Sequence, residues 1–294
     1  MLIKKTYNLN ILFYALVYLI ITIAFVVTLY PFLYIAAVSF SGSQAVYRGD
    51  VFIWPVDFTI AGYRQVFAQR GLMVSYGNTF FYTIAGTSFN LLSTAIAAYP
   101  LSRKEFFARR VLNFVIAFTM YFGGGLIPTY LLITNLGFYN SRWVMIIPGL
   151  LSTFNLMICR SAYSTIPDEL TESAKIDGAN DFIILLKVAI RLITPTLAVL
   201  TLYYAVGHWN NFFTPLLYFS KEDLMPIQVL LRRVLIQASR ELLGGDSMPQ
   251  TERAAATIQI RYVVIMVATL PILTIYPAVQ KYFVKGVMLG AVKG

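Results

Sequence analysis

Residues 169–180 read ELTESAKIDGAN, and they lie between the charge-free apolar runs 143–159 and 192–220. The ionisable side chains in this stretch or directly before it are Asp168, Glu169, Glu172, Lys175 and Asp177. Because Asp, Glu, Lys and Arg are costly at the centre of a lipid bilayer, the stretch is expected outside any membrane that its neighbours cross. The apolar runs around it therefore decide the fold.

Long runs without a charged residue are 6–47, 71–102, 111–141, 143–159, 192–220 and 262–280. A helix needs about 20 apolar residues to cross the hydrocarbon, with about 17 as the lower limit. Charged residues make up 12% of the chain, about half of the roughly 25% found in soluble globular domains. The predicted fold is an all-α membrane protein with six transmembrane helices, near 12–38, 77–100, 111–133, 143–160, 194–219 and 262–281.

The distribution of Lys and Arg predicts the orientation of these spans. Segments 1–5, 103–110, 160–191 and 281–294 contain 13 of them, against 10 in 42–70, 142 and 221–261. The long segment 221–261 supplies six of those ten, and charge in long loops says less about orientation than charge close to the spans. Both termini and the loop 160–191 are therefore expected in the cytoplasm, with the chain in the cytoplasmic (inner) membrane.

The net charge of +10 fits basic residues that gather at span edges, where they meet anionic lipid headgroups. Binding to nucleic acid is not expected. Cys159 is the only cysteine and His208 the only histidine, so an intrachain disulfide and an all-histidine metal site are excluded.

Helix signals surround the polar stretch. Thr165 and Asp168 fit a capping box with Pro167 in the first turn, Gly178 is well placed to end the helix, and Asn180 can cap a second helix. We expect a short helix near 165–178, a sharp bend and then an interfacial helix running into the fifth span. Physical reasoning alone leaves two alternatives, a solvated cytoplasmic loop and a docking element.

The loop resembles that of permease subunits in ATP-binding-cassette importers, where the pattern is E-A-A, three residues, G, nine residues and I-x-L-P. Glu172-Ser173-Ala174 and Gly178 match it with the right spacing, and Val188 stands for Ile. Arg191 occupies the proline position, which puts the geometry after Gly178 in question, and Pro195 follows four residues later. A helix without the proline need not kink there, so Pro195 is the alternative site of the bend.

Other stretches resemble the carbohydrate branch of this family, in particular the complex oligosaccharide and polysaccharide permeases similar to the lipoprotein-associated polysaccharide permease group. They are FGGGLIPTYLLITNLGFYNSRWVMIIPG at 122–149, YYAVGHWNNFFTPLLY at 203–218 and QKYFVKGVMLGAVKG at 280–294. The resemblance implies a type I importer architecture. Its parts would be residues 1–71, a core at 72–284 with a coupling loop at 160–191 and an external loop at 221–261, and a cytoplasmic tail at 285–294.

By the same resemblance, the helix near 165–178 is a coupling helix that fits a cleft on an ATPase. The residues carried over are Glu172, Ser173, Ala174, Asp177 and Gly178. The chain lacks the phosphate-loop pattern G-x-x-x-x-G-K-[ST], so no cofactor is expected on it, and ATP and Mg²⁺ would be used by the partner. The implied partners are a second permease, two ATPase subunits and an extracytoplasmic solute-binding protein.

The fifth predicted span combines amides and aromatic rings, the groups that recognise sugars. Its substrate-path candidates are Tyr203, Tyr204, Trp209, Asn210 and Asn211. Packing is the alternative for Trp209, and a hydrogen-bonded structural role is expected for His208. For Asn78, Asn90 and Asn155 we expect helix-to-helix hydrogen bonds. Gly123-Gly124-Gly125 is expected to allow close helix packing or a bend.

The function that these features favour is a permease subunit of an ATP-driven oligosaccharide or polysaccharide importer, not an enzyme. One alternative is a permease for a non-sugar nutrient. Another is an ion-coupled secondary transporter, which would place coupling carboxylates in its spans, but all six charge-free runs lack Asp and Glu. A membrane-embedded enzyme is the third, and neither paired intramembrane acids nor a metal cluster supports it.

Overall fold

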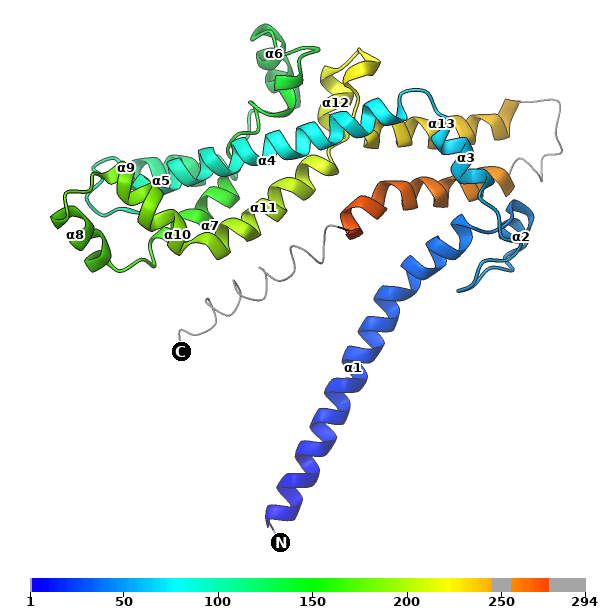
Figure 1. Cartoon of the computed structure of the whole chain (residues 1–294), viewed down its shortest axis with the longest axis horizontal. Coiled ribbons are helices and arrows are strands. Elements are labelled where there is room, and N and C mark those ends of the chain that lie inside the picture. The colour runs from blue at the N-terminus through cyan, green and yellow to red at the C-terminus, as the bar shows by residue number, and fades with distance from the viewer. Residues whose placement is uncertain (1, 245–254, 275–294) are drawn as a thin grey trace. The chain divides into compact units, whose positions relative to one another are not determined.

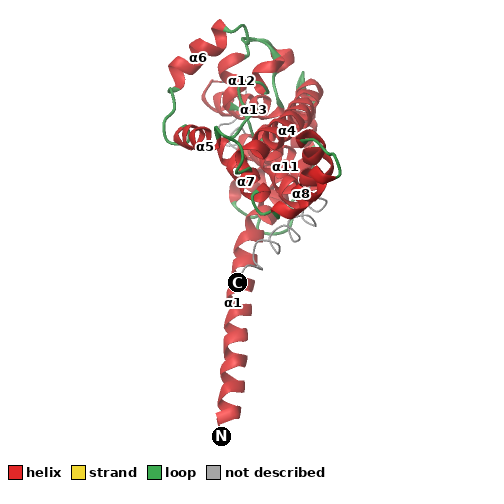
Figure 2. Cartoon of the chain, turned by 90° about the vertical axis from the view of Figure 1, so that its left-hand side faces the viewer, coloured by secondary structure: helices red, strands yellow, loops and turns green. Residues whose placement is uncertain are grey.

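The computed structural model describes residues 2–244 and 255–274, and every regular element in this part of the chain is a helix (Figure 2). The described residues form two compact units. One comprises those of 1–70 and 231–270, and the other those of 71–230 and 271–294. The motif at 280–294, the tail 285–294 and the end of the sixth predicted span lie outside the described residues.

The first unit contains α1 (Leu2–Ser39), α2 (Ser43–Arg48), α3 (Ala61–Phe67) and most of a helix at Ala255–Thr274. Ala37 and Val38, at the end of α1, are buried together with Ala45 and Val51. The amide of Gln259 donates to the Ser41 carbonyl oxygen at 2.7 Å. The end of α1 is thereby joined to the C-terminal helix of this unit.

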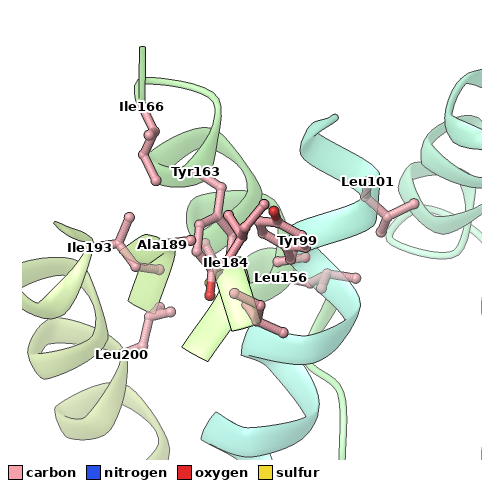
Figure 3. Packing of buried hydrophobic residues seen from close by; sticks show 12 residues of the cluster. Tyr99, Leu101, Leu156, Tyr163, Ile166, Ile184, Ala189, Ile193 and Leu200 are labelled. Carbon is pink, nitrogen blue, oxygen red and sulfur yellow. The ribbon is translucent and has the colours of Figure 1, made fainter. Parts of the chain in front are cut away.

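The second unit is organised around α4 (Leu72–Ser102), which packs along α11 (Thr194–Trp209) and α7 (Thr153–Tyr163) (Figure 1). At one end of α4 the rings of Tyr99 and Tyr163 meet edge to face, with centroids 5.5 Å apart. Figure 3 shows Ile184 and Ala189 against this pair and Leu200 in the same cluster. These apolar contacts join α4, α7 and the segment that precedes α11.

Further elements complete this unit, some of them short. They are α5 (Arg109–Phe118), α6 (Leu126–Asn135), η1 (Arg142–Met145), α8 (Asp168–Ile176), α9 (Asp181–Ile184), a π-helical turn η2 (Leu185–Ala189), α10 (Ile190–Leu192), α12 (Phe213–Tyr218), η3 (Glu222–Leu224) and the start of α13 (Ile227–Gly244).

Polar side chains near the start of α4 tie it to the segment before α13. Asn78 Nδ2 donates to the carbonyl oxygens of Asp223 at 2.6 Å and Met225 at 3.2 Å. Arg142 Nη2 donates to Asn78 Oδ1 at 3.2 Å, and the Tyr82 hydroxyl donates to the Leu224 carbonyl at 2.9 Å. The hydrogen-bonding role expected for Asn78 is confirmed, and its partners lie in or next to the short helices η1 and η3.

Two described helices, Phe13–Ser39 and Ala255–Thr274, are long and apolar enough to cross a membrane. The pair Asp181–Leu192 and Thr194–Trp209, bent by 81°, would count as a third if it forms one span. The predicted span 77–100 lies within the unbroken helix α4. The count of six spans stays a prediction.

Three predicted spans are wrong as continuous helices. The span at 111–133 is interrupted between Phe118 and Leu126, where Gly125 has φ +81°, a conformation that favours glycine. A Cβ on Gly123 or Gly124 would meet no atom within 4 Å. Of the two roles expected for the glycines, the structure therefore has the bend.

The other two broken spans have local causes. In 143–160, regular helix begins only at Thr153, after Pro148, which has no N–H to donate. In 194–219, α11 ends at Trp209 and the side chain of Asn211 accepts from the Thr214 backbone N–H at 3.2 Å. The segment 221–261, predicted to be an external loop, also differs from a plain loop, because α13 occupies Ile227–Gly244.

Candidate functional site: the coupling segment and a polar cavity

The predicted coupling helix is α8, and it begins later than expected. Its N-cap is Pro167, without a side-chain capping bond. Thr165 was expected to cap it, but the Thr165 hydroxyl donates to the Ala162 carbonyl at 2.8 Å and belongs to the preceding turn. Asp168 and Glu169 occupy the first turn of α8, where carboxylates favour the positive end of the helix dipole.

The end of α8 is as predicted. Gly178 has φ +82°, its N–H donates to the Lys175 carbonyl at 3.0 Å, and the Ala179 N–H donates to the Ala174 carbonyl at 2.9 Å. This pair of bonds is a Schellman motif, which usually needs glycine at its left-handed position. Asn180 then caps α9 by accepting from the Ile183 N–H at 2.9 Å.

The bend expected beyond Gly178 lies at Ile193, after Arg191 and not at it. Arg191 is inside α10, and Pro195 is in the first turn of α11, a position where proline is tolerated. The segments on either side meet at 81°. Pro195 thus accompanies the bend, as the alternative reading expected.

Two ion pairs connect α8 to the loop that follows α4. Lys104 Nζ lies 3.0 Å from Asp168 Oδ2, and Lys175 Nζ lies 3.6 Å from Glu105 Oε2. The hydrogen bond from Lys104 lowers the pKa of the Asp168 carboxyl below its ordinary value. Sequence reasoning did not identify this loop as a partner of α8, because no pattern relates segments so far apart.

The five predicted coupling residues differ in exposure. Glu172, Ser173, Asp177 and Gly178 are exposed, whereas Ala174 is half-buried and packs against the core. The buried Thr171 lies on the inner side of the helix, and Ile176 is 86% exposed on the outer side. The helix therefore presents a mixed polar and apolar surface, as a docking element would.

A second feature is a cavity of about 510 Å³ between α4, α7, α11 and neighbouring segments, here named the polar cavity. Apart from His208 and its tyrosines, no residue that lines it is ionisable. Its volume is in the range of small-molecule sites, about 300–1,000 Å³. The polar residues that line it include Asn90, Asn155, Tyr203, Tyr204, His208 and Asn211.

The structure separates the five substrate-path candidates. Tyr203, Tyr204 and Asn211 line the polar cavity, and Trp209 and Asn210 do not. Trp209 is 3% exposed, and its ring meets that of Phe80 edge to face at 5.4 Å. Neither of these two lines this cavity, because the chain turns out of α11 at Trp209 and Asn210 is its exposed C-cap, and their place in a substrate path stays a prediction.

The tyrosines in the cavity wall have different surroundings. Tyr204 is 7% exposed, its hydroxyl shares a 2.7 Å hydrogen bond with Thr94 Oγ1, and it accepts from the Ser152 N–H at 3.4 Å. Tyr203 is 45% exposed. Tyr204 therefore holds α4 and α11 together, and Tyr203 offers an accessible aromatic side chain to the cavity.

His208 and Asn90 form a polar network in the same wall. Asn90 Nδ2 donates to the carbonyl oxygens of Gly149 at 2.6 Å and Leu150 at 2.9 Å. His208 Nε2 lies 2.7 Å from Asn90 Oδ1. A Cβ on Gly86 would clash with the His208 ring. The hydrogen bond expected for His208 is confirmed, but sequence reasoning missed that Asn90, Asn155 and His208 converge on one cavity.

In the described part of the chain the regular elements are helices, two of them long and apolar enough to span a membrane, and a cavity without acidic or basic residues other than His208 brings several polar groups together. These features fit a membrane transport subunit. The chain belongs to the family of binding-protein-dependent transport system inner membrane components, whose model matches residues 7–289. It is a permease subunit of an ATP-binding-cassette importer, in which a separate subunit hydrolyses ATP. The family therefore excludes the two alternative classes, an ion-coupled secondary transporter and a membrane-embedded enzyme.

Named relatives are of the same kind. The chain is 40% identical over 269 residues to Protein LplC of Bacillus subtilis (strain 168), covering 91% of this chain and 90% of the relative. It is 37% identical over 290 residues to the polygalacturonan/rhamnogalacturonan transport system permease protein YtcP of the same organism, covering 97% and 99%. A solved bacterial transporter that imports the acidic polysaccharide alginate matches with a TM-score of 0.80 and 33% identity, over 92% of this chain and 96% of that one.

Proposed function

We propose that this chain is one half of the membrane pathway of an oligosaccharide or polysaccharide importer, with a second related permease as the other half. The observation that carries the proposal is the polar cavity, which brings amide, hydroxyl and aromatic groups from separate segments together. Named relatives that transport polygalacturonan, rhamnogalacturonan and alginate support a sugar polymer as the substrate class. An extracytoplasmic binding protein would deliver it, in keeping with the family description.

In this proposal α8 is the coupling helix, and it docks on one of two ATPase subunits. Its closed C-terminal end supports this role, because a helix held by a Schellman motif and followed by a capped helix transmits displacement better than a loop. Glu172, Ser173, Ala174, Asp177 and Gly178 are the docking residues. The topology proposed with it has six spans and both termini in the cytoplasm.

Uptake by cells tests the substrate class. A deletion strain and the strain complemented with this chain are given radiolabelled oligogalacturonides, neutral oligosaccharides and amino acids. Uptake of at least one oligosaccharide that depends on the chain is the expected result. Chain-dependent uptake of amino acids alone would assign the permease to a non-sugar nutrient.

Docking is tested separately with Glu172→Arg, and with Ser173→Ala as a matched change on the same helix. The Ser173 hydroxyl donates to the Glu169 carbonyl within α8, and alanine is the residue that the family pattern has at this position, so Ser173→Ala should leave docking intact. Glu172→Arg is expected to lower co-purification of the ATPase at least tenfold while membrane insertion is unchanged. Normal co-purification with normal stimulated hydrolysis would remove α8 from the coupling role.

A further inference from the structure

His208 has one ring nitrogen committed and one uncommitted. The committed nitrogen is Nε2, which lies 2.7 Å from Asn90 Oδ1. Among the described residues, Nδ1 has no protein hydrogen-bond partner, and the side chain lines the polar cavity. The chemistry of Nδ1 therefore depends on which nitrogen carries the hydrogen.

Asn90 determines that tautomer. Its Nδ2 group donates to two backbone carbonyls, Gly149 at 2.6 Å and Leu150 at 2.9 Å, so the amide cannot be turned around without losing both bonds. Its Oδ1 can then only accept, and His208 Nε2 must carry the hydrogen. In a neutral imidazole the other nitrogen, Nδ1, is then an acceptor.

Close packing holds the ring in this position. Gly86 on α4 faces the ring so closely that a Cβ there would clash with its Nε2, Cε1 and Cδ2 atoms. The ring is therefore held by the hydrogen bond on Nε2 and by close packing against α4 at Gly86, where any side chain would occupy the space of the ring. A preorganised acceptor of this kind contributes more to recognition than a mobile one.

We infer that His208 is a specificity-determining residue of the polar cavity, in which Nδ1 accepts a hydrogen bond from a hydroxyl of the passing sugar. This inference rests on the proposed function, because it assumes that the cavity is part of the sugar pathway. A substrate that lacks the hydroxyl leaves Nδ1 without a partner, and such unpaired groups are the basis of discrimination by hydrogen bonding.

Two substitutions separate the nitrogens. His208→Gln places an amide nitrogen where Nε2 was, so it keeps the donor to Asn90 and loses the Nδ1 acceptor. His208→Asn places its polar atoms near Nδ1, so it keeps an acceptor and loses the contact with Asn90. The assay uses the intact importer with its binding protein and compares an oligosaccharide with its set of monodeoxy analogues.

The measured quantity is the ratio of uptake of each analogue to the parent sugar when both compete at low concentration. Contacts with the binding protein are the same for all variants and cancel when these ratios are compared. We expect the native importer to disfavour one analogue about tenfold, His208→Gln to bring that ratio to near one, and His208→Asn to keep most of the discrimination.

Each failure has a separate meaning. If His208→Gln assembles and discriminates as the native importer does, the inference is wrong and the proposed function stands. If the native importer disfavours no analogue, or if His208→Asn assembles and loses the discrimination, the inference is likewise wrong. If the native importer takes up no oligosaccharide, it is the proposed function that fails.

Discussion

Lys104 and Asp168 form an ion pair, with Nζ and Oδ2 3.0 Å apart, that joins the loop after α4 to the first turn of α8. We expect this pair to hold the angle at which α8 meets its partner. Lys104→Glu and Asp168→Lys should each raise the ATP hydrolysed per sugar transported in proteoliposomes, and the swapped double variant should restore it. A double variant as poorly coupled as the worse single one would show that the pair has no such role.

The pH dependence of this pair has a defined sign. Folding lowers the pKa of the Asp168 carboxyl, chiefly through the hydrogen bond from Lys104. The stabilisation by the ion pair is therefore fully present when the pH is above the ordinary pKa of an aspartate carboxyl. It is lost as the pH falls through the lowered pKa of Asp168. Coupling should not change through this pair between about pH 5 and pH 8. It should weaken in high salt, because both side chains are exposed, and Lys104→Glu should remove the salt sensitivity.

Gly178 gives a prediction about backbone conformation. Its φ of +82° costs an L-residue about 1–2 kcal/mol, so Gly178→Val should destabilise the end of α8 and reduce ATPase binding. Gly178→Asn is the matched control, because asparagine tolerates the left-handed conformation. Co-purification of the ATPase measures both variants, and equal loss for the two would mean that the conformation is not the cause.

Gly86→Ala should disturb the cavity wall. The added Cβ would clash with the His208 ring, and overpacking of this kind costs typically about 1–3 kcal/mol. A lower melting temperature of the solubilised complex is expected. Gly77→Ala, in the same helix and in open space, is the control and should have no such effect. A Gly86→Ala variant as stable as the control would contradict the packing described for His208.

Tyr203 and Trp209 should give opposite phenotypes. Tyr203→Ala removes an accessible ring from the polar cavity and should reduce sugar uptake with little change in thermal stability. Trp209→Ala removes a buried ring, and such truncations cost about 3–5 kcal/mol, so it should lower the amount of assembled protein. Uptake per assembled complex separates the two, and a normal yield of Trp209→Ala with impaired uptake would place Trp209 in the pathway.

Local signals predicted the end of α8 and the start of α9 well. The positive φ at Gly178 and the cap at Asn180 follow from properties of single residues, and both were predicted. The misplaced cap at Thr165 shows the limit, because Pro167 in the N-cap position ended the preceding turn instead. The interruptions near Gly125 and Pro148 were missed because hydropathy counts apolar residues without regard to backbone conformation.

The meeting of polar side chains in the cavity wall could not be predicted from their spacing in the sequence. Asn90 and His208 are 118 residues apart, and only the packing of α4 against α11 brings them to 2.7 Å. Tyr203 and Trp209 looked equivalent as aromatic residues of one span. The end of α11 at Trp209 separates them, and it depends on a turn after the helix that composition does not reveal.

The 81° bend at Ile193 has a mechanical consequence. A single stretch of chain, Asp168 to Asn211, contains α8 at one end and the α11 side of the cavity wall at the other, with the bend between them. In the proposed coupling role of α8, a displacement along α9 and α10 would therefore reach α11 almost at right angles to the direction of α9 and α10. It would move Tyr203 and Tyr204 sideways and would not shift α11 along its own axis.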